Sequence, residues 1–233
     1  MRYNFTFYVH HHGAGHITRV LQIVKTIRQQ CNCDIALLGT GLSKYLHGIP
    51  HGIKTIDLPP DIPSKDDSYH CLHPVRHLHY SPLNIANLLE RNALIVDHLR
   101  ENPRTICIVD VSCEIAQLVR LCGVPSVLVR QHGNRTDLAH QLAYEGAAYI
   151  IAPYAQEMSS SSEEGRYASK TLFSGGFSRF DGHKATNAEQ DDQIALIVGK
   201  GGTNLTNRFV QHLQKQLSSR YTLHIIGDVN AKP

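Results

Sequence analysis

The turn at residues 10–19, His-His-His-Gly-Ala-Gly-His-Ile-Thr-Arg, combines residue types that do chemistry when they lie together. Glycines let a backbone approach a ligand closely, and the free N–H groups at a helix start bind anions or polar groups. His16 closes the glycine pair, and an imidazole with a pKa near ~6.5 can remove a proton from a sugar-like hydroxyl. We therefore treat His16 as a candidate catalytic base; a helix cap or a simple substrate contact is the alternative.

A second candidate, Asp110, ends an apolar run and is followed by Ser112 and Glu114. The carboxyl ends of parallel strands are where α/β proteins bind ligands. Asp110 or Glu114 can therefore orient His16 or hold an acceptor hydroxyl. The alternative is an ordinary helix start, in which Ser112 is the N-cap and Glu114 complements the helix dipole.

A third group of candidates, Arg130, His132, Arg135 and Asp137, crowds one loop around a glycine. Two guanidinium groups at the carboxyl edge of a sheet suit a phosphate or a carboxylate. A solvated loop with no ligand is the alternative.

The 16 histidines raise the question of a metal, because two groups of them, at 10, 11, 12, 16 and at 70, 73, 77, 79, are clustered. Zinc sites need defined spacings and Cys, Asp or Glu partners, as in His-Glu-x-x-His. Pro74 separates His73 from His77 and weakens a helical site. We predict no metal.

A nicotinamide cofactor is disfavoured by the same glycine turn. The dinucleotide fingerprint requires a third glycine where Thr18 stands, and an acidic residue after the second strand, which here ends Leu37-Leu38-Gly39. We predict no cofactor. Cys113 lacks the glycines of a nucleophile elbow and is expected to be a buried packing residue.

Short apolar runs alternate with amphipathic segments along most of the chain. Ile17, Val20, Leu21, Val24 and Ile27 fall on one helical face, and a long helix is expected at 84–100. Continuous apolar strands between such helices predict an α/β fold, a doubly wound parallel sheet covered on both faces. The strands are expected within 5–9, 35–38, 53–58, 105–109, 125–129 and 149–152.

Two polar segments interrupt this pattern. Residues 59–82 contain five prolines and are expected to form a functional flap or an irregular segment. Residues 181–193 are expected to be a linker between a domain at 1–180 and the start of a second, similar domain at 194–233. The second segment contains only a β-α-β unit, which is too short to bury a core by itself, so we expect an incomplete domain.

Composition excludes several classes of protein. With 23 Lys+Arg against 20 Asp+Glu, the chain is too balanced for a protein that coats nucleic acid. A hydrophobic content of 42% argues against disorder, and no 18-residue apolar run suggests a membrane span. Six cysteines without a CxxC pair indicate reduced thiols and a cytoplasmic location, with a place at the periphery of the inner membrane left open.

Several motifs together resemble a known family. Gly13, Gly15 and His16 match the first glycine turn of GT-B glycosyltransferases of the family 28 type. The run 110–153 is similar to a bacterial subgroup of predicted glycosyltransferases, with its Asp-x-Ser helix start, Gly-Val-Pro and arginine-rich loop. FSGGFSRFDG at 173–182 and GKGGT at 199–203 look like the same subgroup. The family's main donor-binding stretch lies further downstream than residue 227.

The resemblance implies a two-domain fold whose N-terminal Rossmann-like domain holds the acceptor and whose C-terminal domain holds a nucleotide-sugar. His16 and Asp110 would be catalytic, and Gly201, Gly202 and Thr203 would face the donor phosphates. The predicted acceptor-binding residues are Gly13, Gly15, Arg19, Ser112, Glu114, Arg130, His132 and Arg135.

We therefore expect a glycosyltransferase of the hexosyltransferase type that uses a nucleotide-sugar, UDP-linked, with inversion and without a metal. The acceptor would be lipid-linked or a small molecule. One alternative is a truncated form or a non-catalytic subunit that recruits the acceptor and borrows a donor domain from a partner chain. The other is a sugar-nucleotide 2-epimerase on the same fold.

Overall fold

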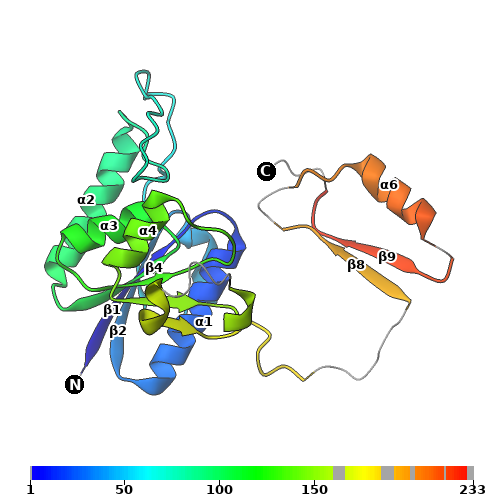
Figure 1. The fold of residues 1–233 in the computed structure, drawn as a ribbon, viewed down its shortest axis with the longest axis horizontal. Helices are drawn as coiled ribbons and strands as arrows, with labels where there is room; N and C mark the ends of the chain where they lie inside the picture. The colour runs from blue at the N-terminus through cyan, green and yellow to red at the C-terminus, as the bar shows by residue number, and fades with distance from the viewer. Residues whose placement is uncertain (1, 160–165, 185–191, 200–202, 218, 230–233) are drawn as a thin grey trace. The chain divides into compact units, whose positions relative to one another are not determined.

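The computed structural model describes residues 2–159, 166–184, 192–199, 203–217 and 219–229. The chain divides into two compact units (Figure 1). The first comprises Met1–His11 with His16–Arg179, and the second comprises His12–Gly15 with Phe180–Pro233.

The first unit is built on a seven-stranded, all-parallel sheet with the strand order β3-β2-β1-β4-β5-β6-β7. Successive strands are added first to one side of β1 and then to the other. This arrangement is the doubly wound Rossmann-like order and confirms the predicted fold class. The strands are β1 (Tyr3–Val9), β2 (Cys33–Gly39), β3 (Lys54–Asp57), β4 (Thr105–Asp110), β5 (Ser126–Val129), β6 (Tyr149–Ala152) and β7 (Thr171–Phe173).

Helices cover both faces of this sheet. They are α1 (Ala14–Gln30), α2 (Ala86–Glu101), α3 (Cys113–Leu121) and α4 (Leu138–Gly146), with 3-10 helices η1 (Leu42–Gly48), η2 (Gln156–Met158) and η3 (Ala168–Lys170). Alternate residues of β1 face opposite sides. Phe7 packs in the core that holds Val20 of α1, whereas Tyr8 packs in the core that holds Ile95 of α2 and Val119 of α3. The short apolar strands are therefore buried on both faces, as their composition predicts.

The second unit pairs β8 (Gln193–Ile197) with β9 (Thr222–Ile226) in parallel. Helix α6 (Asn207–Gln216) connects them and begins at Thr206, whose side-chain hydroxyl accepts a hydrogen bond from the Phe209 amide (3.2 Å). A β-α-β unit is thus present where the sequence predicts one.

The segment at 59–82 connects β3 to α2 without a helix or an extended strand. Its only pairing with regular geometry in the described chain is an isolated antiparallel bridge between Cys71 and Leu83. The buried carboxylate of Asp67 accepts hydrogen bonds from the amides of Ser64 (2.6 Å) and Ala86 (3.1 Å). One side chain therefore fixes both the path of this segment and the start of α2, and these bonds lower the pKa of Asp67.

Candidate functional site

The predicted catalytic pair lies where the order of the strands reverses. Strands β1 and β4 are neighbours, but the chain leaves β1 toward β2 and leaves β4 toward β5. Such a switch point opens a crevice at the carboxyl ends of the two strands, where α/β proteins bind ligands. His16 lies in the first turn of α1, directly after β1, and Asp110 is the last residue of β4.

His16 and Asp110, 94 residues apart in the chain, are in direct contact. His16 Nδ1 lies 2.6 Å from Asp110 Oδ2. The Asp110 side chain is fully buried, whereas the His16 side chain retains 12% of its exposure. A carboxylate can only accept, so we assign the proton to Nδ1, which leaves Nε2 as the basic nitrogen. This geometry fixes the orientation of the imidazole, which suits its Nε2 to proton removal.

Arg19, predicted to bind an acceptor, contacts the same carboxylate. Its Nε donates to Asp110 Oδ1 at 3.1 Å, and its Nη2 also reaches Asp110 Oδ1 and lies 3.0 Å from His16 Nδ1. The three residues form a compact cluster of two basic groups around one buried carboxylate. A buried carboxylate requires a compensating charge, and the Arg19 guanidinium supplies one beside Asp110.

The backbone just after Asp110 is held in an unusual conformation. Val111 has φ +58°, in the left-handed region that β-branched residues avoid. Ser112 follows as the N-cap of α3, accepting from the Ile115 amide at 3.3 Å. Strained residues of this kind persist where the surrounding structure determines them, and they concentrate at functional sites. The tight turn brings α3 back immediately beside the site.

Glu114 anchors the 59–82 segment. Its Oε1 accepts hydrogen bonds from the amides of His79 and Tyr80, the latter at 2.9 Å. Gln117, one turn further along α3, donates from Nε2 to the His77 carbonyl at 3.0 Å. The start of α3 therefore holds the far end of the segment close to the Asp110 turn, and acceptor binding by Glu114 or Ser112 stays a prediction.

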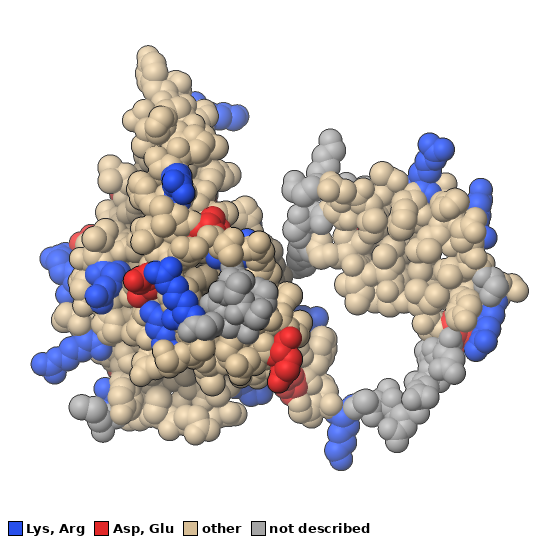
Figure 2. Space-filling view, in the orientation of Figure 1, with Lys and Arg blue, Asp and Glu red and all other residues tan. Residues whose placement is uncertain are grey.

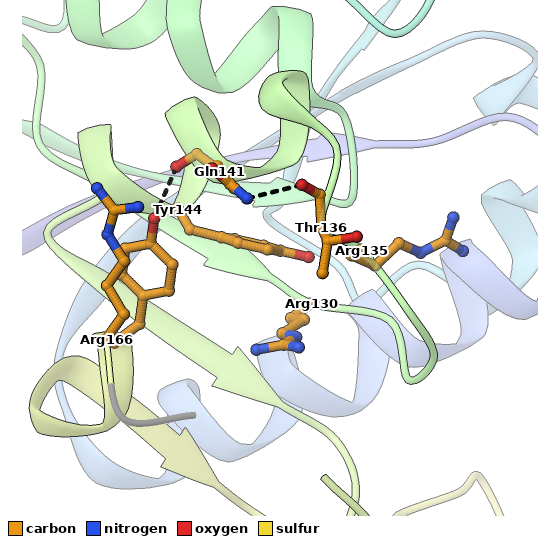
Figure 3. A pocket seen from close by; sticks show the side chains of 7 residues that line it. Arg130, Arg135, Thr136, Gln141, Tyr144 and Arg166 are labelled. Atoms are coloured by element: carbon orange, nitrogen blue, oxygen red, sulfur yellow. Dashed lines mark hydrogen bonds between the residues drawn. The ribbon is translucent and has the colours of Figure 1, made fainter. Parts of the chain in front are cut away.

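The loop after β5 places its predicted residues in different surroundings. Arg130 is buried and its guanidinium lies 5.1 Å from the Tyr144 ring centroid. His132 Nε2 contacts the Met158 carbonyl at 2.9 Å, and Arg135 donates to Gln131 Oε1 at 3.0 Å. Arg130 and Arg135 line one cavity, which His132 does not line (Figure 3). The three residues remain acceptor-binding predictions.

Asp137 ends the same loop as the N-cap of α4. Its Oδ1 accepts from the His140 amide at 3.1 Å, and its Oδ2 lies 2.7 Å from His140 Nδ1. Burial alone would raise the pKa of Asp137, but the hydrogen bonds from His140 outweigh it and lower that pKa. Asp137 is therefore an ionised cap that fixes where α4 begins.

The glycine turns are partly described. Gly13 has φ +83°, a backbone conformation that glycine adopts without strain. A Cβ added at Gly15 would meet no neighbouring atom. Gly201 and Gly202 lie outside the described residues. Thr203 Oγ1 accepts from the Leu205 amide at 3.0 Å, in the turn before α6. The assignment of these positions to acceptor and donor phosphate stays a prediction.

Sequence reasoning missed one buried cation in the first unit. Arg91 of α2 is 1% exposed and donates to Thr40 Oγ1 and the Pro59 carbonyl, both at 2.6 Å, and to the Tyr8 hydroxyl. It ties the start of the 59–82 segment to the sheet. Helical periodicity placed Arg91 in a helix, but no sequence signal distinguishes this buried arginine from an exposed one.

Other chemistry is not favoured by the described residues. Burial raises the pKa of Cys113 to about 12, so its thiol is protonated at neutral pH. Within the described part of the chain, no three His, Cys, Asp or Glu side chains are grouped to hold a metal ion.

No helix among the described residues is both long and apolar enough to span a membrane. On the face shown in Figure 2, basic and acidic side chains are interspersed over the first unit.

No model of a known protein family and no curated protein matches the sequence. Solved structures match the fold. The match to the crystal structure of MurG from Acinetobacter baumannii covers 98% of this chain and 67% of the MurG chain, with a TM-score of 0.54 and 14% identity. A UGT transferase from Siraitia grosvenorii in complex with UDP covers 88% of this chain and 60% of its own, with a TM-score of 0.53 and 11% identity.

A further match, UGT2 from Phytolacca americana complexed with UDP-2fluoro-glucose and pterostilbene, has a TM-score of 0.47 and 13% identity. It covers 66% of this chain and 48% of its own, so this chain spans about half the length of that protein. At these identities the likeness concerns the fold alone. The chain has the α/β, Rossmann-like fold of its GT-B neighbours.

Proposed function

We propose that the protein to which this chain belongs transfers a hexose from a UDP-sugar to an acceptor hydroxyl, with inversion and without a metal. The observation that carries the proposal is the His16–Asp110 contact of 2.6 Å at the switch point of the sheet. The fold likeness to a transferase in complex with UDP supports the choice of donor.

The reaction needs one displacement. His16 Nε2 takes the proton of the acceptor hydroxyl, and the buried charge of Asp110 stabilises the resulting imidazolium. The acceptor oxygen then bonds to the anomeric carbon from the face opposite the diphosphate, and the bond from that carbon to the UDP oxygen breaks. A single displacement inverts the anomeric centre. Helix starts and basic side chains can stabilise the leaving diphosphate without a metal, and the proposed donor-side residues are Gly201, Gly202 and Thr203.

The first test is His16→Gln in the intact protein, with release of UDP from UDP-glucose and UDP-N-acetylglucosamine measured in the presence of candidate acceptors. Without the base, the rate of transfer should fall about a hundredfold or more. KM for the donor and the melting temperature should stay near the wild-type values, because His16 is at the mouth of the site rather than in the core.

His47→Gln is the matched control, since His47 is an exposed histidine of η1. It should retain full activity. Unchanged transfer in His16→Gln would remove His16 from the mechanism. Release of an epimerised sugar nucleotide without any acceptor would favour the 2-epimerase alternative instead, and turnover by the 233-residue chain alone would exclude the non-catalytic subunit.

A further inference from the structure

The first unit contains a cavity of about 210 Å³ at the amino ends of its strands, the edge of the sheet opposite to the candidate site. Its lining comes from the first halves of β1, β2, β3 and β4 and from the last turn of α2. Pockets for drug-sized ligands have volumes of roughly 300–1,000 Å³. This cavity is smaller, so it suits a small molecule rather than a nucleotide-sugar.

The alternation of side chains along the strands places the polar part of this lining on one face of the sheet. Asn4 and Thr6 are two residues apart on β1 and therefore share a face. Asp34 of β2 is paired with Asn4. Lys54 of β3 is paired with Ala36, two residues after Asp34. Neighbouring paired residues project to the same side of a sheet, so the polar side chains of three strands surround one space.

Three hydrogen-bonded side chains, Thr6, Thr105 and His98, form the buried floor of the cavity. Asn102 Nδ2 donates to the His98 carbonyl at 2.8 Å and lies 3.4 Å from His98 Nδ1. An amide nitrogen can only donate, so we assign Nδ1 as an acceptor and the ring proton to Nε2, which faces Thr6 Oγ1 at 3.0 Å.

The two hydroxyls of the floor hold one hydrogen more than their own contacts use. The contact of 2.9 Å between Thr6 Oγ1 and Thr105 Oγ1 takes one hydroxyl hydrogen, and the His98 ring supplies its own. Among the described residues, no other hydrogen bond of either hydroxyl is found. One O–H group is therefore left to donate to a molecule in the cavity, because buried polar groups are as a rule hydrogen-bonded.

Opposite charges lie at two points of the rim. Burial and the positive charge of Lys54 lower the pKa of His98, so the ammonium acts on the floor. Arg2 contacts Asp34 Oδ1, but both side chains are exposed, the pair contributes little free energy, and Oδ2 can still accept. From the pairing of the strands, the Cα atoms of Lys54 and Asp34 are about 8 Å apart. A small molecule can therefore contact both charged groups.

The end of α2 favours a positive group in the same space. The C-terminal end of a helix carries a partial negative charge, and Asn102, the C-cap of α2, lines the cavity. Glu101 lies in the same turn and raises the pKa of His98, against the effect of Lys54. A simple anion would meet this negative end and Asp34 as well as Lys54, whereas a molecule with both charges matches the whole lining.

We propose that this cavity binds a small α-amino acid as its zwitterion. The carboxylate accepts from the Lys54 ammonium and from the spare hydroxyl of the floor, and the ammonium group donates to Asp34 Oδ2 and to Asn102 Oδ1. The volume allows only a short side chain. The site and the candidate catalytic pair lie at opposite ends of the strands, so amino-acid binding does not depend on sugar transfer.

Calorimetric titration of glycine and L-alanine into the full chain tests this proposal without any UDP-sugar. We expect saturable binding of both at one site. Propionate lacks the ammonium group of L-alanine, and ethylamine lacks its carboxylate. Each should bind at least about tenfold more weakly than L-alanine, because each leaves one charged group of the site without its partner.

Two variants test the two ends of the site. Lys54→Gln and Asp34→Asn remove one charge each at exposed positions where folding is not at risk. Each should weaken the binding of L-alanine about tenfold. The matched controls are Lys25→Gln, at an exposed position of α1, and Asp97→Asn, in an exposed pair with Arg100. Both controls should bind L-alanine as the wild type does.

The contrary outcomes are distinct. Absence of saturable binding of both amino acids, or wild-type affinity in either Lys54→Gln or Asp34→Asn, would overturn the proposal. Propionate or ethylamine binding as tightly as L-alanine would overturn the zwitterion as the ligand class.

Discussion

Strand β4 has a hydrogen-bonded cluster at each end, and each cluster contains one histidine. The two clusters differ in the groups that face the imidazole. At its last residue, Asp110, a buried carboxylate lies 2.6 Å from His16 Nδ1. At its first residue, Thr105, the neighbours are hydroxyls: Thr6 Oγ1 lies 2.9 Å from Thr105 Oγ1 and 3.0 Å from His98 Nε2.

The two surroundings differ in charge. His16 faces a buried carboxylate and the Arg19 guanidinium. His98 is buried and its Nε2 faces a neutral hydroxyl, and burial, together with the nearby Lys54, lowers its pKa. The comparison separates a histidine that faces a buried carboxylate from one that belongs to a hydrogen-bonded core, although the sequence shows the same residue type at both positions.

The largest effect is expected from Asp110→Asn, which removes the charge that distinguishes the first cluster. Arg19 and His16 lose their ionic partner, so the free energy of unfolding should fall by about 3 kcal/mol. Sugar transfer by the intact protein should drop about a hundredfold. Urea denaturation and UDP release measure the two effects.

Asp97→Asn provides the control, because Asp97 forms an exposed pair with Arg100 at 3.0 Å. Its free energy of unfolding should change by less than about 1 kcal/mol. A wild-type stability and rate in Asp110→Asn would mean that the two clusters do not differ in function.

A smaller effect is expected from Thr6→Val, which keeps the shape of the side chain but removes the hydroxyl that joins the second cluster. His98 Nε2 and Thr105 Oγ1 then lose a buried partner, at a cost of about 1–3 kcal/mol in the free energy of unfolding. Transfer by the folded protein should be unchanged. Thr26→Val, at an exposed position of α1, should leave stability nearly unaltered. Loss of transfer without loss of stability in Thr6→Val would contradict a structural role for this cluster.

The smallest effect is the pH dependence contributed by His98. Its pKa in the folded chain is lower than in the unfolded chain, because burial and Lys54 disfavour the charged ring, while Glu101 opposes them. The unfolded chain therefore binds the proton more readily, so stability is full above the unfolded pKa of ~6.5 and decreases as the pH falls below it.

His98→Gln should flatten this decrease, which melting temperatures between about pH 7.5 and about pH 5.5 measure. The comparison is between slopes, because the variant also changes the absolute stability. Parallel loss of stability in variant and wild type would show that other groups titrate in this range.

Much of the fold follows from local patterns. The apolar spacing of α1 predicts its buried face, and Ile17, Val20 and Val24 are buried. The glycine turn led to His16 as a candidate, and the rule that α/β proteins bind ligands at the carboxyl ends of parallel strands led to Asp110. Periodicity and edge position are properties of short stretches, so they can be read without knowing what packs against them.

Other features could not be predicted because they depend on partners from distant segments. Arg19 was expected to bind an acceptor, yet it contacts Asp110, 91 residues away. Arg91 and His98 lie on a helix that the sequence predicts. The oxygens that accept from Arg91, however, come from β1, from the residue after β2 and from the start of the 59–82 segment. No spacing rule within α2 identifies such acceptors.

By itself, the sequence determined the alternation of strands and helices, the glycine turn with its histidine, and the aspartate at the end of β4, because each depends on the order of neighbouring residues. The tertiary structure alone decided which histidines face carboxylates and which arginines are buried. Those relations arise only when the sheet brings residues from separate strands within hydrogen-bonding distance of one another.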